Sequence, residues 1–153
     1  MIALQDYKPK ITGMLDVELP RFAAEHPTVR ITAIGLYCCP GTGLLSLCLN
    51  NTDTATSHED NCPDFEYVGY EEMSFDEWQE EYESDEPRVK ISALRIYKHD
   101  HDGDGGDEAY NEPFFTFLVD LAQEYFKPGG SKVRATWIGV QMLDSRFVKF
   151  WKM

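Results

Sequence analysis

The sequence predicts a single α+β domain in which amphipathic helices cover a mostly antiparallel sheet. Apolar residues recur at helical spacing in separate segments, a nearly continuous apolar hairpin lies among them, and no regular βαβ alternation follows. The 153 residues suffice for one domain with an ordinary core, and 42% hydrophobic content excludes a disordered chain. We therefore expect residues 1 to 153 to fold as one domain.

The first segment is predicted to be an amphipathic helix followed by a hairpin. Pro9 suits the first turn of this helix, whereas Pro20 is expected to kink or restart it. Residues 29 to 38 and 44 to 49 are rich in β-branched and apolar side chains, and PGTG between them has turn chemistry. Because both runs are almost continuously apolar, we expect these strands to be central in the sheet. The apolar positions of the helix are Ile11, Met14, Leu15, Leu19 and Phe22.

Two further helices are predicted in the second half of the chain. Ser74 and Glu77 have the spacing of a capping box, so a helix is expected to start at Ser74. Its aromatic side chains, Trp78 and Tyr82, are expected to belong to the core, and the alternative is that they anchor a partner. Asn111 is the expected N-cap of a third helix, which the sequence KPGG ends.

The remaining segments are predicted to be loops and strands. Residues 50 to 64 form a polar loop, and FEYVGY is a candidate short strand. RVKISALRIY is ambiguous because its alternation of apolar residues changes phase. KVRATWIGVQML is expected to be a strand, and RFVKFWK a last strand or a short tail element.

The four cysteines are predicted to be reduced structural thiols. Cys38 and Cys39 lie in an apolar run, where a free cysteine behaves as a small apolar residue. The sequence has no CxxC pair, and the spacing of Cys48 and Cys62 around His58 fits none of the usual zinc patterns. A metal site or a disulfide is the alternative.

The acidic residues are concentrated in one part of the chain. The formal net charge is -13, and residues 53 to 112 hold 20 acidic residues but only four basic ones. This balance disfavours nucleic acid as a ligand, because phosphate binding needs positive charge, and it favours a basic partner. No stretch resembles a signal peptide or a membrane span, so we expect a cytoplasmic protein.

One acidic segment resembles the start of a calcium-binding loop. In KHDHDGDGGDEAYNE three aspartates at alternating positions precede Gly105, but Asn111 stands at the twelfth position, where a bidentate glutamate is required. We therefore expect a solvated acidic loop without metal, and a looser calcium loop is the alternative. The candidate ligands of that alternative are Asp100, Asp102, Asp104 and either Glu108 or Glu112.

The most unusual stretch, YEEMSFDEWQEEYESDE, carries nine acidic residues and no lysine or arginine. On a helix, Asp76 and Glu80 are like-charge neighbours four residues apart, which costs about 0.2 to 0.5 kcal/mol. Folding alone does not select such pairs, so the segment is either a solvated face or a docking surface for a cationic partner. The residues predicted to bind the partner are Glu71, Glu72, Asp76, Glu77, Glu80, Glu81 and Glu83.

Motifs of catalysis are missing from the sequence. It contains no GxSxG, no HExxH and no phosphate-binding glycine loop ahead of a lysine. Carboxylate pairs are so abundant that no single pair indicates catalysis. We therefore expect a binding protein that is not an enzyme and needs no cofactor.

The chain also resembles the small acidic immunity-type proteins that are encoded beside bacterial polymorphic toxins. The resemblance rests on an A-x-G-L-Y strand and a tryptophan in the acidic segment, and it implies an inhibitor that binds a cognate toxin inside the producing cell. The resemblance also implies that a cognate toxin which attacks nucleic acids is often basic, which agrees with the charge of this chain. The alternatives are a calcium- or other metal-binding module and an accessory subunit of a larger assembly. The matching residues are Ala33, Gly35, Leu36, Tyr37 and Trp78.

Overall fold

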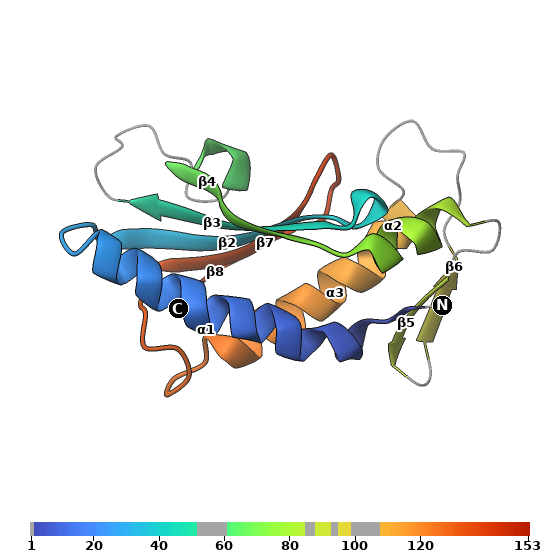
Figure 1. Ribbon diagram of the computed structural model, residues 1–153, viewed down its shortest axis with the longest axis horizontal. Coiled ribbons are helices and arrows are strands. Elements are labelled where there is room, and N and C mark those ends of the chain that lie inside the picture. The colour runs from blue at the N-terminus through green and yellow to red at the C-terminus, as the bar shows by residue number, and fades with distance from the viewer. Residues whose placement is uncertain (1, 52–60, 85–87, 93–94, 99–107) are drawn as a thin grey trace.

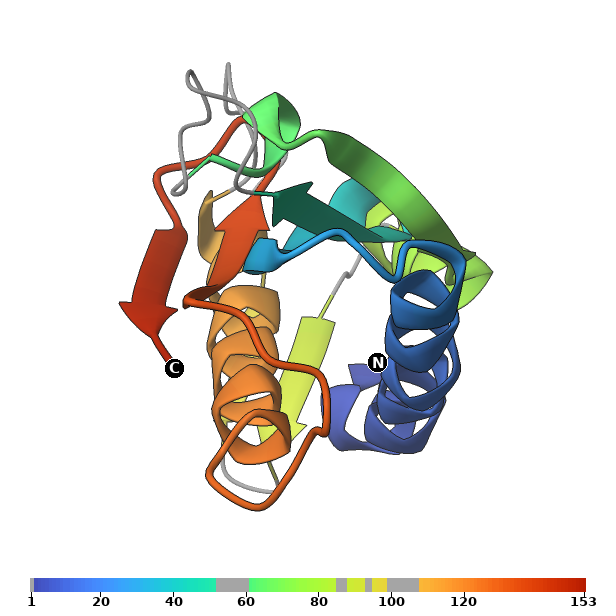
Figure 2. The same ribbon diagram turned by 90° about the vertical axis from the view of Figure 1, so that its left-hand side faces the viewer.

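The computed structural model describes residues 2–51, 61–84, 88–92, 95–98 and 108–153. It confirms the predicted α+β class: a five-stranded sheet is covered on one face by the helices α1 (Lys8–Glu25) and α3 (Glu108–Tyr125) (Figure 1). Seen from the end of the sheet, the two helices lie beside each other on the same side of it (Figure 2). The main core therefore fills the space between this helical pair and the sheet.

The predicted hairpin is central in the sheet, as expected. The sheet order is β4-β3-β2-β7-β8, so β2 (Ile31–Cys39) is the middle strand and β3 (Leu44–Asn51) is its antiparallel neighbour. On its other side β2 pairs in parallel with β7 (Trp137–Met142), whereas the remaining pairs are antiparallel. The edge strands are β4 (Tyr67–Ser74) and β8 (Val148–Lys152). The sheet is therefore mixed but mostly antiparallel.

The ambiguous segment RVKISALRIY contributes two short strands instead of one element. These are β5 (Arg88–Ser92) and β6 (Arg95–Lys98), and they pair antiparallel with each other. β1 (Ile2–Ala3) pairs in parallel with β5 and completes a separate three-stranded sheet. The change of phase that made the sequence ambiguous therefore falls between two strands.

Side chains alternate between the two faces of the sheet, as the period of a strand requires. On β2, Ile34 and Leu36 point into the main core under the helices, whereas Ala33 points to the opposite face. There Cys48 and Phe65 join Ala33 in a second, smaller buried cluster. The sheet therefore has a helix-covered face and an outer face with its own small core.

Helix α1 buries the apolar stripe that the sequence predicted. Pro9 lies in its first turn, but Pro20 lies inside a helix that continues to Glu25, so the expected restart at Pro20 is wrong. Pro20 cannot donate a backbone hydrogen bond to the residue four positions earlier. Leu19 and Phe22, both buried, flank the proline, so packing against the sheet maintains the helix there. The buried apolar residues are Ile11, Leu15, Leu19 and Phe22.

The predicted caps of the other two helices are wrong. Ser74 belongs to strand β4, and helix α2 (Asp76–Glu83) begins after Phe75 without a side-chain cap. Its start is determined by the backbone instead, because the Phe75 N–H donates to the Gly43 carbonyl at 2.8 Å. α3 begins at Glu108, so Asn111 is a buried residue within its first turns and not an N-cap.

The polar segment predicted at residues 50 to 64 is partly structured. Strand β3 continues to Asn51, and a 3-10 turn (Cys62–Asp64) precedes β4. Residues 52 to 60 lie outside the described residues. The last four residues of the candidate strand FEYVGY form the first part of strand β4, which continues to Ser74.

Candidate functional site: an acidic face on helix α2

Helix α2 divides its residues between the core and an outward acidic side. Trp78 is fully buried, as the sequence predicted, and its ring stacks on Phe75 with 4.1 Å between the ring centroids. Tyr82 is half-buried against Tyr110, with the ring centroids 5.0 Å apart. These aromatic contacts fix the rotation of the helix about its axis. As a result, its other side points to solvent.

Five carboxylates on this side define what we call the acidic face. Asp76, Glu77, Glu80 and Glu83 come from α2, and Asp6 comes from the 3-10 turn Leu4–Tyr7; all five are exposed. Among the residues that the structure describes, no lysine, arginine or histidine forms an ion pair with any of them. The acidic face therefore carries uncompensated negative charge, which attracts cations.

Glu81 departs from the prediction. It was expected to point to solvent beside Glu80, but only 8% of its surface is exposed. The reason is the helical period: Glu81 follows Trp78 by three residues and so shares the inward side of α2. Glu81 therefore belongs to the packing of α2 and is not part of the acidic face.

A hollow of about 450 Å³ separates α2 from the N-terminal segment. The N-terminal segment lines it with Asp6 and Tyr7, and α2 lines it with Glu77, Glu80 and the mostly buried Glu81. Burial raises the pKa of Tyr7, and the Glu77 carboxylate raises it further. Asp6 was not among the predicted site residues, because no pattern near it in the sequence indicates that the chain brings it beside α2.

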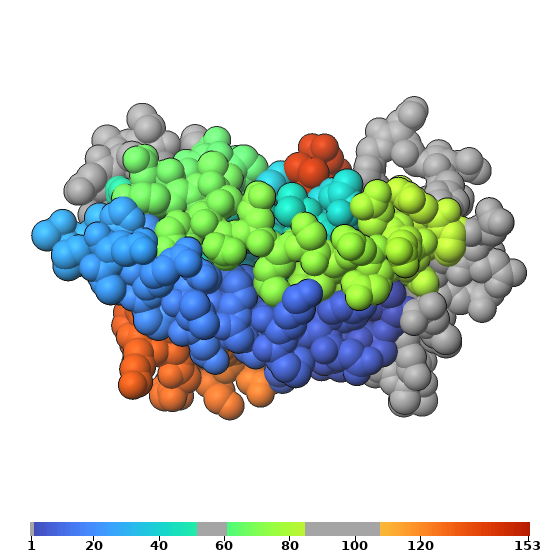
Figure 3. All heavy atoms as spheres, viewed as in Figure 1, coloured from blue at the N-terminus to red at the C-terminus, as the bar shows by residue number. Residues whose placement is uncertain are grey.

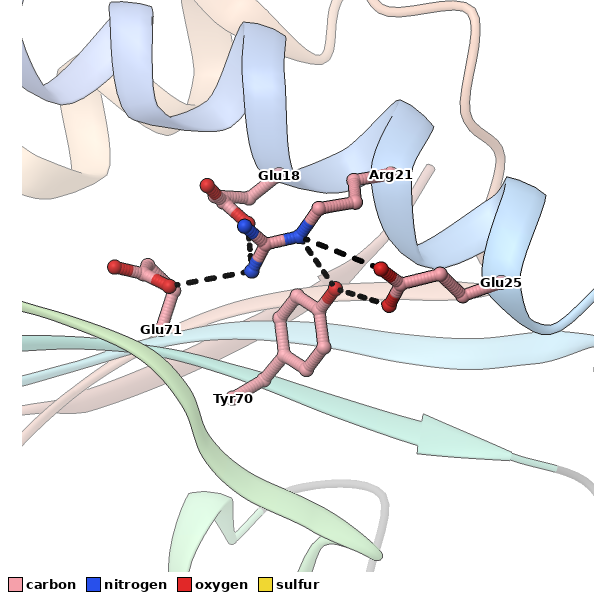
Figure 4. A network of polar contacts seen from close by, with 5 residues as sticks. All are labelled: Glu18, Arg21, Glu25, Tyr70 and Glu71. Atoms are coloured by element: carbon pink, nitrogen blue, oxygen red, sulfur yellow. Dashed lines mark hydrogen bonds and ion pairs between the residues drawn. The ribbon is translucent and has the colours of Figure 1, made fainter.

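Glu71 and Glu72 lie on strand β4 and not on a helix, and both have partners. Arg21 of α1 lies among the side chains in Figure 4: its Nη2 is 2.5 Å from Glu18 Oε2 and 3.4 Å from Glu71 Oε2. Arg21 Nε donates to the Tyr70 hydroxyl at 3.3 Å, which raises the pKa of the guanidinium. Glu25 lies 3.9 Å from Arg21 Nε and also accepts from Tyr70. Glu71 therefore shares one guanidinium with Glu18 and Glu25, so its charge is compensated only in part.

Glu72 is exposed and accepts a hydrogen bond from the Ser46 hydroxyl at 3.2 Å. The space-filling view shows β4 and α2 as one continuous surface above α1 (Figure 3). Of the seven residues predicted to bind a partner, the structure thus places four on the acidic face and Glu72 beside it. Glu71 is in the arginine network and Glu81 is buried.

Two candidate ligands of the alternative calcium loop, Glu108 and Glu112, belong to the described residues. Asp100, Asp102 and Asp104 lie outside the described residues. Glu108 is already engaged, because its two carboxylate oxygens accept from the Ser145 hydroxyl and the Arg146 N–H, both at 3.1 Å. Glu112 is exposed on α3. Within the described part of the chain, no three His, Cys, Asp or Glu side chains are arranged to hold a metal ion.

A second hollow, of about 520 Å³, lies between α1, α3 and the loop after α3. Its carboxylates are already bound within the protein. Lys8 Nζ lies 2.5 Å from Glu124 Oε2 and lowers the pKa of that carboxyl, and the Tyr125 hydroxyl donates to Asp16 at 2.8 Å. This hollow lacks the uncompensated charge of the acidic face.

Comparison with known proteins did not assign the chain to a family. No family model, no curated protein and no solved structure matched it. In the described residues, no helix is both long enough and apolar enough to span a membrane. The function must therefore be inferred from the geometry of the acidic face.

Proposed function

We propose that the protein is a non-catalytic binding protein that inhibits a basic partner protein through its acidic face. The observation that carries the proposal is the set of five exposed carboxylates that form no ion pair within the described part of the chain. Four of them lie on the side of α2 that faces away from Trp78 and Phe75, and the fifth is Asp6. Like charges held this close destabilise the helix, so their retention favours a role in binding. Clustered carboxylates accelerate encounter with a cationic protein and reject anionic ones.

The resemblance to immunity-type proteins supports a toxin as that partner. In this proposal the protein acts inside the producing cell, where it blocks the toxin before release. The hollow beside Asp6, Glu77 and Glu80 supports the same interaction, because about 450 Å³ accommodates a lysine or arginine side chain of the partner between carboxylates.

The test measures binding to the product of the neighbouring gene, since immunity proteins are encoded beside their toxins. We expect the double variant Glu77→Lys/Glu80→Lys to weaken binding at least ~10-fold, because it reverses charge on the acidic face. In the unchanged protein, raising the salt concentration from about 50 to about 500 mM should slow association more than it speeds dissociation.

The matched control is Glu112→Lys/Asp120→Lys on helix α3. Both residues are exposed, and this pair changes the net charge of the chain by the same amount. Its effect on the dissociation constant should stay within ~3-fold. Equal losses in the two double variants would indicate attraction by net charge alone, and an unchanged constant in both would refute the role of the acidic face.

A further inference from the structure

Two cysteines lie together on the outer face of the sheet, away from the acidic face. Cys48 comes from β3 and Cys62 from the 3-10 turn that precedes β4. Both are fully buried in the small cluster that Ala33 and Phe65 complete. Residues far apart in the sequence thus place two free thiols in one apolar site.

The two thiols lie at the same place on the outer face of the sheet. Cys48 is the register partner of Gly35 across β2 and β3, and a Cβ on Gly35 would lie 2.4 Å from Cys62 Sγ. The Gly69 N–H donates to the Cys48 sulfur at 3.4 Å. The interaction with Cys62 lowers the pKa of Cys48, whereas the interaction with Cys48 and burial raise the pKa of Cys62. The Gly69 N–H also lowers the pKa of Cys48 and does not depend on the turn Cys62–Asp64, so Cys48 is the thiol that reacts first when the turn opens.

The surroundings hold the Cys62 sulfur in place. The Cys62 N–H donates to Gln141 Oε1 at 2.8 Å, and Gln141 Nε2 donates to Asn61 Oδ1 at 2.8 Å, so the turn is attached to β7. Gly35 lies under the sulfur: a Cβ at this position would be 2.4 Å from Cys62 Sγ. Gly35 in the central strand therefore leaves the space that the Cys62 thiol occupies beside Cys48.

We propose that Cys48 and Cys62 form a disulfide bond when the protein meets a small-molecule disulfide such as oxidised glutathione. The Cys48 thiolate attacks one glutathione sulfur and releases the other glutathione, which takes up a proton. Cys62 then loses its proton and attacks the Cys48 sulfur of this mixed disulfide, which releases the second glutathione. The two protein thiols lose two electrons and two protons, and the oxidant becomes two glutathione thiols.

Because both sulfurs are buried, the disulfide can form only after a local opening of the fold. Both sulfurs are inaccessible in the closed fold, so the reagent reaches Cys48 only while the turn Cys62–Asp64 is detached from the sheet. The bond then fastens this turn, and the start of β4 after it, to β3. Oxidation is therefore expected to be slow and to stabilise the closed arrangement.

The other two cysteines do not offer the same pairing. Cys38 and Cys39 are neighbours on β2, so their side chains point to opposite faces of the strand. Cys38 is buried in the main core, and burial raises its pKa well above the ordinary value. The structure therefore predicts one specific disulfide among the four cysteines.

The experiment maps disulfides in the native protein. The reduced protein is incubated with glutathione buffers of rising oxidised fraction, quenched with acid, alkylated in denaturant and digested without reductant. Mass spectrometry should show the peptides of Cys48 and Cys62 joined, with Cys38 and Cys39 alkylated. The linked protein should melt several degrees above the reduced form.

Variants test the specificity of the link. Cys39→Ser should leave it unchanged, whereas Cys48→Ser and Cys62→Ser should abolish it; the map of the unchanged protein remains decisive if either of these two fails to fold. The proposal is overturned if no buffer yields the Cys48–Cys62 link, if glutathione stays attached without ring closure, or if other pairings form in equal amount. A lower melting temperature of the linked protein would also overturn it.

Discussion

At the scale of single residues, burial distinguishes two ion pairs of equal length. Arg21 and Glu18 lie 2.5 Å apart, as do Lys8 and Glu124. The Glu18 side chain is 10% exposed, whereas the Glu124 side chain is 56% exposed. A buried carboxylate that loses its partner keeps its desolvation cost, and an exposed one is solvated by water. The two pairs should therefore contribute differently to stability.

We expect Arg21→Met to lower the free energy of unfolding, because Glu18 is left without its cation. Lys8→Met is the control and should lower it clearly less. Urea denaturation of both variants measures the difference. Adding Glu18→Gln to Arg21→Met should restore part of the loss. Similar losses for Arg21→Met and Lys8→Met would contradict the role of burial.

At the scale of elements, the fit of β8 on β7 depends on one glycine. Gly139 pairs with Phe150 across the two strands. A Cβ on Gly139 would lie 2.0 to 2.5 Å from three atoms of the Phe150 ring, so the ring covers the glycine backbone. The edge strand β8 is thus positioned by an aromatic ring that only a residue without a side chain accommodates.

Gly139→Ala should therefore lower the free energy of unfolding by about 1–3 kcal/mol, because the ring must move from its place. In the Phe150→Ala background the same substitution should cost clearly less. Gly13→Ala is the control: nothing lies within 4 Å of its added methyl group on α1, so it should stabilise by about 0.5–1 kcal/mol. Additive effects of Gly139→Ala and Phe150→Ala would show that the ring and the glycine are not in contact.

At the scale of the whole molecule, partly or fully buried tyrosines make stability depend on alkaline pH. The pKa of Tyr7, Tyr37, Tyr110 and Tyr125 is raised in each case, with burial as the largest cause. These tyrosines come from the N-terminal turn, the central strand and both ends of α3. In the unfolded chain the same side chains ionise near pH 10.

A raised pKa means that these tyrosine hydroxyls keep their protons to a higher pH in the folded state than in the unfolded state. The contribution to stability is then complete below about pH 10 and is lost as the pH rises above it. Urea denaturation between pH 8 and 11 should show this fall. Tyr110→Phe removes a fully buried hydroxyl and should make the fall shallower. A slope identical to that of the unchanged protein would mean that Tyr110 does not contribute.

The local patterns of the sequence were sufficient to predict most elements. The stripe from Ile11 to Phe22 gave α1, and the apolar runs around PGTG gave the central hairpin. Helix ends were predicted less well, because a backbone bond from Phe75 to Gly43 determines the start of α2 where the pattern indicated Ser74. Contacts between segments distant in the sequence leave no local pattern.

For the candidate site, too, some features could be predicted from the sequence and others only from the fold. The sequence by itself determined that negative charge is concentrated near α2, since the type and position of each residue fix its formal charge. Only the tertiary structure decided that Glu81 is buried, that Glu71 lies beside Arg21, and that Asp6 joins the acidic face. The pairing of Cys48 with Cys62 also required the fold. The physical reason is that burial and charge compensation arise between segments that meet only when the chain is folded.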